Sequence, residues 1–129
     1  MTDEIKTHRL IDYRLCGVPL ETGNGASRVE MIAVAEMAVD EYELIHGGFV
    51  FGLADHAAMI AVNDPHVVLG AADIRFIKPV KTGDKLVATA TVVAEKGRKR
   101  LVRVRVDRAA DSVFEGEFTC FLLDKHVLG

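Results

Sequence analysis

The sequence has few cysteines, little net charge and no long apolar segment. Cys16 and Cys120 lie too far apart to indicate a disulfide framework or a zinc site, and two such thiols are typical of a reduced, cytoplasmic protein. The formal charge of −3 at pH 7 favours neither nucleic acid nor a membrane surface as partner. The start, MTDEIKTHRLIDYRL, lacks the apolar stretch of a signal peptide. The longest apolar run, Phe49–Val62, is interrupted by Asp55 and His56 and is too short to cross a bilayer.

Repeats, low-complexity tracts and linkers are also missing from the sequence, and a length of 129 residues fits one domain. We therefore expect a single domain over 1–129, in which residues 1–14 form a surface arm. His8, His66 and His126 show no ligand spacing, and no group of histidine, cysteine and carboxylate suggests a metal. No metal is expected.

The pattern of apolar residues predicts one buried helix and a set of strands. Leu15–Leu20 and Ala26–Val34 are strand candidates, separated by a turn at Glu21–Gly25. Gly48–Asn63 favours a helix that is apolar on all faces, so the rest of the chain must enclose it. Four further strand candidates follow, namely Val67–Ile77, Lys85–Ala94, Lys99–Arg108 and Ser112–Leu123. Their short connections favour antiparallel pairing, which predicts an α+β fold with a curled sheet around one helix.

Asp55 is the unusual residue of this helix. An ionised carboxylate is costly to bury without a partner, so Asp55 must be hydrogen bonded, have a shifted pKa or face a cavity. Gly48 lies at the expected helix N-terminus, where free N–H groups attract negative charge and a ligand can approach closely. Such an N–H can hold the oxyanion of an attacked carbonyl, and a nearby carboxylate can attack that carbonyl or activate a water. The pair indicates an acyl-transfer site.

The spacing of these two residues predicts a site shared between subunits. Gly48 and Asp55 are about two helical turns apart, so they lie on nearly the same face but about 10 Å apart along the axis. One chain alone cannot bring both to one carbonyl. A two-fold dimer with paired helices would bring Gly48 of one chain towards Asp55 of the other. The alternative is that Asp55 is a satisfied core residue and that the glycines form a plain turn.

The segment HGG-x4-LAD, from His46 to Asp55, resembles that of hot-dog-fold acyl-CoA thioesterases of the phenylacetate-pathway type. The similarity extends over about Ala26–Leu123 and includes DIRFIKPVKTGDKL after the helix. The resemblance implies a curled antiparallel sheet around a long helix, a homodimer or a dimer of dimers, and no metal. It also implies that Asp55 is the base or nucleophile and that the Gly48 N–H of the opposite subunit binds the oxyanion.

Two further comparisons qualify this resemblance. Many of these enzymes carry an asparagine six residues before the histidine, and here Asp40 stands at that position as a candidate catalytic residue. The segments AADIRFIKPVKTGDKLVATATV and VFEGEFTCFLL also resemble the malonyl-CoA-binding domain of a bacterial repressor of fatty-acid synthesis. That repressor has asparagine at the position of Asp55 and arginine at that of His46, which favours an enzyme with a neutral acyl group here.

The other candidate residues concern orientation and substrate binding. His46 is expected to orient the loop, whereas His56 points about 100° away from Asp55 and is not expected to form a dyad with it. Gly47, Phe49 and Met59 are candidates to line the acyl site. The candidate residues for the phosphates of coenzyme A are basic, namely Lys78, Lys81, Arg98, Lys99 and Arg100. The alternative for this basic cluster is the solvated face of an outer strand.

Taken together, the sequence predicts an acyl-CoA thioesterase for an aromatic or medium-chain acyl group. No cofactor is expected besides the coenzyme A of the substrate, and the only macromolecular partner expected is a further copy of the chain. The main alternative is a non-catalytic acyl-CoA-binding sensor or regulatory module. A hot-dog dehydratase is a weaker alternative, because the helix lacks the Asp/His arrangement of hydratases.

Overall fold

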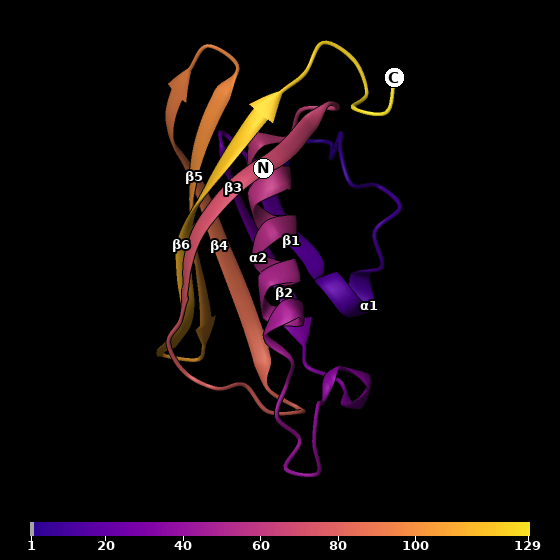
Figure 1. The fold of residues 1–129 in the computed structure, drawn as a ribbon, viewed down its shortest axis with the longest axis vertical. Helices are drawn as coiled ribbons and strands as arrows, with labels where there is room; N and C mark the ends of the chain where they lie inside the picture. The colour runs from indigo at the N-terminus through magenta and orange to yellow at the C-terminus, as the bar shows by residue number, and fades with distance from the viewer. Residues whose placement is uncertain (1) are drawn as a thin grey trace.

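The computed structural model describes residues 2–129 and shows a six-stranded antiparallel sheet curled around one long helix, α2 (Figure 1). This confirms the predicted α+β hot-dog fold. The elements are α1 (Tyr13–Cys16), β1 (Val18–Gly23), β2 (Ala26–Ile32), a 3-10 turn η1 (Ala35–Met37), α2 (Gly47–Val62), β3 (Val67–Phe76), β4 (Lys85–Lys96), β5 (Lys99–Arg108) and β6 (Asp111–Leu122). The strand order is β1-β2-β4-β5-β6-β3, so β1 and β3 form the edges of the sheet.

Helix α2 is enclosed because its sequence is apolar on every side. Leu53, Ala57 and Ile60 are fully buried, and the helix packs most closely against β2, β4 and β5. Asn63 ends it in the left-handed conformation (φ 53°, ψ 46°), which asparagine tolerates better than most residues. The predicted helix and its Asn-Asp-Pro end are therefore confirmed.

The strands follow the predicted alternation. On β5, Val102, Val104 and Val106 are fully buried, whereas Arg103 and Arg105 face outwards. The boundaries of β3 to β6 agree with the predicted segments to within two residues. The sheet therefore has one apolar face against the helix and one polar face outside.

The first part of the chain differs from its prediction. Residues 13–16 form the short helix α1 instead of the start of a strand, so β1 begins three residues later than predicted and continues through most of the predicted turn. The N-terminal arm is attached to the end of α2 by hydrogen bonds. The side chain of Asn63 accepts a hydrogen bond from the Lys6 N–H and donates one to the Glu4 carbonyl, and Thr7 is buried. The polar end of α2 thus fastens the arm, a contact that sequence periodicity does not reveal.

Edge strand β3 has a long exposed stretch. Its residues from Gly70 to Asp73 are all exposed, and β6 pairs with only one side of the strand. On that side, a Cβ on Gly116 of β6 would lie 2.6 Å from the carbonyl oxygen of Asp73 and 2.5 Å from the side chain of Ile74. The two strands therefore approach closely because residue 116 has no side chain.

Gly116→Ala is expected to lower the free energy of unfolding by about 3 kcal/mol, because the new methyl group meets the β3 backbone, which cannot rotate out of the way as a side chain could. Urea unfolding followed by circular dichroism measures the change. An unfolding midpoint equal to that of the wild type would contradict the close approach of β3 and β6.

Candidate functional site

The turn before α2 is held by His46. The residue is the N-cap of the helix, and its Nδ1 accepts a hydrogen bond of 2.8 Å from the Gly48 N–H. A Cβ on Gly48 would lie only 2.8 Å from this nitrogen, so glycine is needed for the ring to come this close. His46 therefore orients the loop, as the sequence predicted.

The N–H group without an acceptor in this turn belongs to Gly47. Within residues 2–129 no oxygen or nitrogen accepts a hydrogen bond from the Gly47 N–H, as is usual in the first turn of a helix. Gly47 also lines a pocket of about 290 Å³, whose other residues include Val50, Phe76 and Pro79. A free donor thus lies beside a mostly apolar pocket, where a hydrogen bond is stronger than in water.

Asp55 is half-buried on α2, and one of its oxygens is fully buried. That oxygen, Oδ1, has no hydrogen-bond partner among the described residues. Desolvation raises the pKa of Asp55 from 3.8 to about 6. Oδ1 is therefore not hydrogen bonded within the described residues, and of the three possibilities for this carboxylate its burial favours a raised pKa.

Cys120 on β6 faces the same region from the sheet. Burial, and then the negative charge of Asp55, raise the pKa of the Cys120 thiol to about 12. The thiol therefore stays protonated at neutral pH and is not a nucleophile. Asp55 lies in the same region and has a pKa of about 6, far below that of the thiol.

His56 is buried on α2 and faces the short helix α1. Its Nδ1 lies 3.0 Å from the carbonyl oxygen of Cys16, and its ring stacks on Tyr13 with 6.0 Å between the centroids. Burial lowers the pKa of His56, which keeps the ring neutral. The predicted absence of an Asp55–His56 dyad is confirmed.

Asp40 lies outside this arrangement. Its Oδ1 accepts hydrogen bonds from the backbone N–H groups of Tyr42 (3.0 Å) and Leu44 (3.2 Å), so the carboxylate closes the loop before the diglycine turn. The structure therefore places Asp40 in a structural role in that loop, and it does not bring its carboxylate to Asp55.

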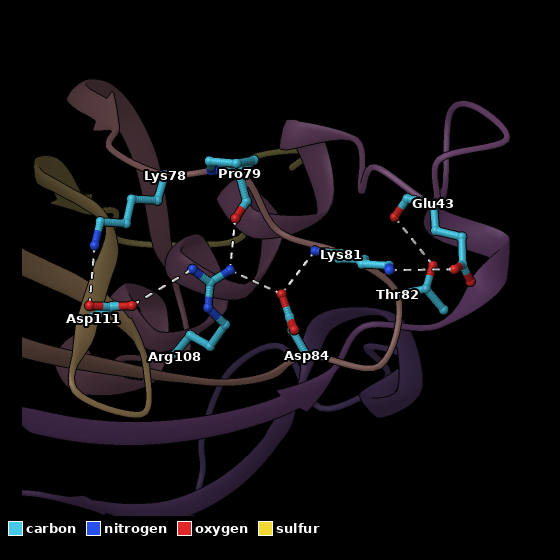
Figure 2. Close-up of polar contacts among 8 residues, drawn as sticks. All are labelled: Glu43, Lys78, Pro79, Lys81, Thr82, Asp84, Arg108 and Asp111. Atoms are coloured by element: carbon cyan, nitrogen blue, oxygen red, sulfur yellow. Dashed lines mark hydrogen bonds and ion pairs between the residues drawn. The ribbon is translucent and has the colours of Figure 1, made fainter.

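Most of the basic residues predicted to bind coenzyme A are already paired. Lys78 forms an ion pair with Asp111, and Lys81 reaches Glu43 (Figure 2). On the β4–β5 hairpin, Arg98 pairs with Asp124 and Arg100 with Glu95. Except for Arg100, whose side chain is mostly buried, the cations of these pairs are exposed, and such pairs cost little to break. The pairs leave Lys99 as the one predicted cation without an ion pair in the described chain.

Arg108 fixes the loop that connects β3 to β4. Its guanidinium donates to the Pro79 carbonyl (2.7 Å) and to the Asp84 carboxylate (3.0 Å), and the same carboxylate accepts from the Lys81 N–H (Figure 2). The Val80 carbonyl of this loop accepts a hydrogen bond from the Ile45 N–H. The loop thereby supports the segment that enters the diglycine turn.

The apolar residues of the site are only partly those predicted. Phe49 is half-buried and lies edge-on to the His46 ring, whereas Met59 is fully buried in the core. Sequence reasoning missed Phe76, whose ring would lie 3.1 Å from a Cβ on Gly47 and which is 55% exposed. The sequence signal that could have indicated Phe76 is its position, an aromatic residue at the end of an edge strand.

Two classes of site find no support in the described residues. No group of three or more histidine, cysteine, aspartate or glutamate side chains within residues 2–129 could hold a metal ion. No helix in the same range is long and apolar enough to span a bilayer.

Comparison with known proteins identifies the family. The thioesterase superfamily model matches residues 42–115, which contain the diglycine turn, α2 and β3 to β5. The chain belongs to this superfamily. An uncharacterized protein of Pyrococcus horikoshii is 51% identical with a TM-score of 0.98, over 100% of this chain and 99% of that one.

A second structural neighbour is the Escherichia coli PaaI protein from the phenylacetic acid degradation operon, which is 25% identical with a TM-score of 0.79 and covers 87% of this chain and 83% of its own. Among curated relatives, a methylthioribose-1-phosphate isomerase of Aquifex aeolicus is 44% identical over 122 residues, which is 94% of this chain but 27% of the relative. The transcription factor FapR of Caldanaerobacter subterraneus is 30% identical over 72% of this chain and 46% of the relative. The chain thus spans about a quarter of the length of the isomerase and about half of the length of FapR.

Proposed function

We propose that this chain hydrolyses the thioester of an acyl-CoA. The observation that carries the proposal is Asp55, a half-buried carboxylate with an unpartnered oxygen and a pKa of about 6. A carboxylate of this kind is a stronger base than an exposed one and is still mostly ionised at pH 7, so it can deprotonate a water or attack a carbonyl. Membership of the thioesterase superfamily supports this reaction class.

The proposed oxyanion donor is the Gly47 N–H. The sequence pointed to Gly48, but in the structure the Gly48 N–H donates to His46, and the Gly47 N–H has no acceptor in residues 2–129. The thioester oxygen would accept from Gly47 while Asp55 of the partner chain attacks the carbon or activates a water. Collapse of the tetrahedral intermediate then breaks the C–S bond. If Asp55 activates a water, the proton that it takes passes to the leaving sulfur, and the acid and the thiol of coenzyme A are released. If Asp55 attacks directly, coenzyme A leaves as its thiolate and water then hydrolyses the acyl-Asp55 anhydride.

The site requires a second copy of the chain, which we propose binds through β3. An unpaired edge strand with four exposed residues in a row can pair with an identical strand. A two-fold axis between Ala71 and Ala72 would pair the two β3 strands antiparallel and place Val67 opposite the partner's Phe76. The partner's Gly47, beside that Phe76, would then lie at the same end of the paired strands as Val67.

The acyl group is proposed to be aromatic or medium-chain. The pocket beside Gly47 is lined by aliphatic side chains and Phe76, with Lys78 as its one charged residue, and that lysine is paired with Asp111. A neutral apolar group fits such a lining better than a carboxylate does. The similarity to PaaI of a phenylacetic acid degradation operon agrees with an aromatic group.

The test is release of free thiol from a panel of acyl-CoA thioesters, with phenylacetyl-, hexanoyl-, acetyl- and malonyl-CoA as members, alongside calorimetric binding of each. Faster thiol release from phenylacetyl-CoA and hexanoyl-CoA than from malonyl-CoA supports the proposal. The similarity to the transcription factor FapR favours one other function, an acyl-CoA-binding module. Binding of acyl-CoA without thiol release from any member would establish that second function instead.

The rate is expected to depend on pH through Asp55. Desolvation raises its pKa to about 6, and the reactive form is the ionised one, so kcat/KM should fall about tenfold per pH unit below 6 and level off above about 7. Steady-state rates between pH 4.5 and 8 measure this profile. A rate constant that does not change between pH 5 and 7 would contradict the assignment of Asp55 as base or nucleophile.

A further inference from the structure

A second pocket lies between the N-terminal arm, the loop after α2 and the C-terminal tail. Its volume is about 520 Å³. Figure 1 shows the yellow C-terminal tail at the end of the molecule where α2 finishes and β3 begins, away from the diglycine turn. Of its twelve lining residues none is acidic, and five carry basic side chains, namely Lys6, His8, Arg9, His66 and His126.

The two strongest cations of this pocket are free. Lys6 and Arg9 are exposed and form no ion pair with any residue in the range 2–129. Asp64, which precedes the lining residue Pro65, accepts a hydrogen bond from the His66 N–H, and Asp124 pairs with Arg98. The pocket therefore offers two cations without an ion pair in the described residues, whereas most of the basic residues predicted from the sequence are paired.

The pocket also has an apolar part. Leu10 is fully exposed beside it, Val127 is 61% exposed, and Val68 completes this side. Exposed apolar side chains and histidine rings next to two cations suit a ligand that carries both a flat ring and phosphate groups. A nucleotide has this combination of groups.

The position of the pocket relates it to the proposed site. Cys120 of β6 lies close enough to Asp55 for the charge of Asp55 to act on its thiol, and Cys120 pairs with Leu69 of β3. Val67, which lines the pocket, is two residues from Leu69 on the same strand. Two strand residues span about 7 Å, which is shorter than the extended pantetheine arm of coenzyme A. In the proposed dimer, Val67 also lies opposite the partner's Phe76, at the end of β3 that faces the diglycine turn of the partner.

We propose that this pocket binds the nucleotide end of coenzyme A, with Lys6 and Arg9 on its phosphate groups. The inference rests on the proposed function for the identity of the ligand, and it replaces the β4–β5 hairpin as the phosphate site. The backbone of the arm is held independently of these two side chains, because Asn63 bonds to the Lys6 N–H and to the Glu4 carbonyl. Both side chains can therefore be changed without releasing the arm.

The experiment compares the double variant Lys6→Gln/Arg9→Gln with Arg28→Gln/Lys85→Gln, which removes the same charge from exposed ion pairs elsewhere. Calorimetry measures binding of adenosine 3′,5′-bisphosphate, the nucleotide end of coenzyme A. Steady-state kinetics measure thiol release from an acyl-CoA and from the same acyl group on N-acetylcysteamine, which has no nucleotide. Lys6→Gln/Arg9→Gln is expected to bind the bisphosphate at least about tenfold more weakly than the wild type, and its KM for the acyl-CoA should rise by a similar factor. Its kcat for the acyl-CoA and its rate with the N-acetylcysteamine thioester should be unchanged.

The outcomes separate this inference from the proposed function. Equal bisphosphate binding by the wild type and Lys6→Gln/Arg9→Gln would overturn the inference, and so would an equal loss in both double variants, since that is a general charge effect. Bisphosphate binding that is lost only in Lys6→Gln/Arg9→Gln supports the inference. If that result occurs while no thioester is hydrolysed, the proposed function fails and the nucleotide site stands.

Discussion

Asp55→Asn is expected to lower thiol release from acyl-CoA by about a thousandfold and to leave acyl-CoA binding within about threefold. Asparagine has the same shape but can neither attack the carbonyl nor accept the proton of a water at neutral pH. The measurements are kcat from thiol release and Kd from calorimetry on the same preparation. Asp107→Asn, the same chemical change on β5 and outside the proposed dimer contact, is the matched control and should keep full activity.

The free energies of unfolding of the wild type and of Asp55→Asn test the ionisation of Asp55 independently of activity. Burial raises the pKa of Asp55 from 3.8 to about 6, so the ionised carboxylate destabilises the native state. The wild type should therefore lose about 2–3 kcal/mol as the pH rises from 4 to above 6, and Asp55→Asn should not. Urea unfolding at pH 4 and pH 7.5 would show equal stability at the lower pH and a more stable variant at the higher one. Full turnover by Asp55→Asn, or a less stable variant at pH 7.5, would contradict the assignment.

Two inactive variants are expected to restore activity when they form mixed dimers. Gly47→Pro removes the proposed oxyanion donor at the first helical position, which tolerates proline, although the ring of Phe76 must move slightly. A dimer of one Asp55→Asn chain and one Gly47→Pro chain has one site with both groups intact. Random mixing makes half of the dimers mixed, each with one of its two sites active, so about a quarter of the wild-type rate should return.

The mixed dimers are made by co-expression of the two variants with different tags, and light scattering with size exclusion checks that they form. A rate near zero in verified mixed dimers would show that Asp55 and Gly47 do not act across the subunit boundary. A single chain of 14.1 kDa with full activity would remove the need for a dimer altogether. Either result leaves the thioester hydrolysis itself open to the panel test.

The sequence predicted those parts of the fold that depend on local pattern. The unbroken apolar character of α2, the Asn63-Asp64-Pro65 end and the alternation of Val102, Val104 and Val106 with arginines each have a direct structural counterpart. These signals work because a buried helix and a half-buried strand impose different periods on apolar residues. The carboxylate on α2 was found for the same reason, since it violates the pattern around it.

The features of the site that the sequence did not predict depend on contacts that local patterns do not encode. The Gly48 N–H is occupied because the His46 ring folds back onto it, and spacing alone could not distinguish it from the Gly47 N–H. The pairing of Arg98 with Asp124 depends on the C-terminal tail returning to the β4–β5 hairpin. Lys6 and Arg9 are separated from His126 by nearly the whole sequence, so no local motif could have indicated their shared pocket.

In the proposed thioesterase, Arg108 would influence how substrates are selected. Through Pro79 and Asp84 it anchors the connection from β3 to β4, and that connection forms one wall of the pocket beside Gly47. A wall braced by a guanidinium at two points does not act as a closing flap. Discrimination between acyl groups should therefore follow the rigid shape of the pocket, and altering it should require substitutions at Val80 or Phe76 instead of changes in loop length.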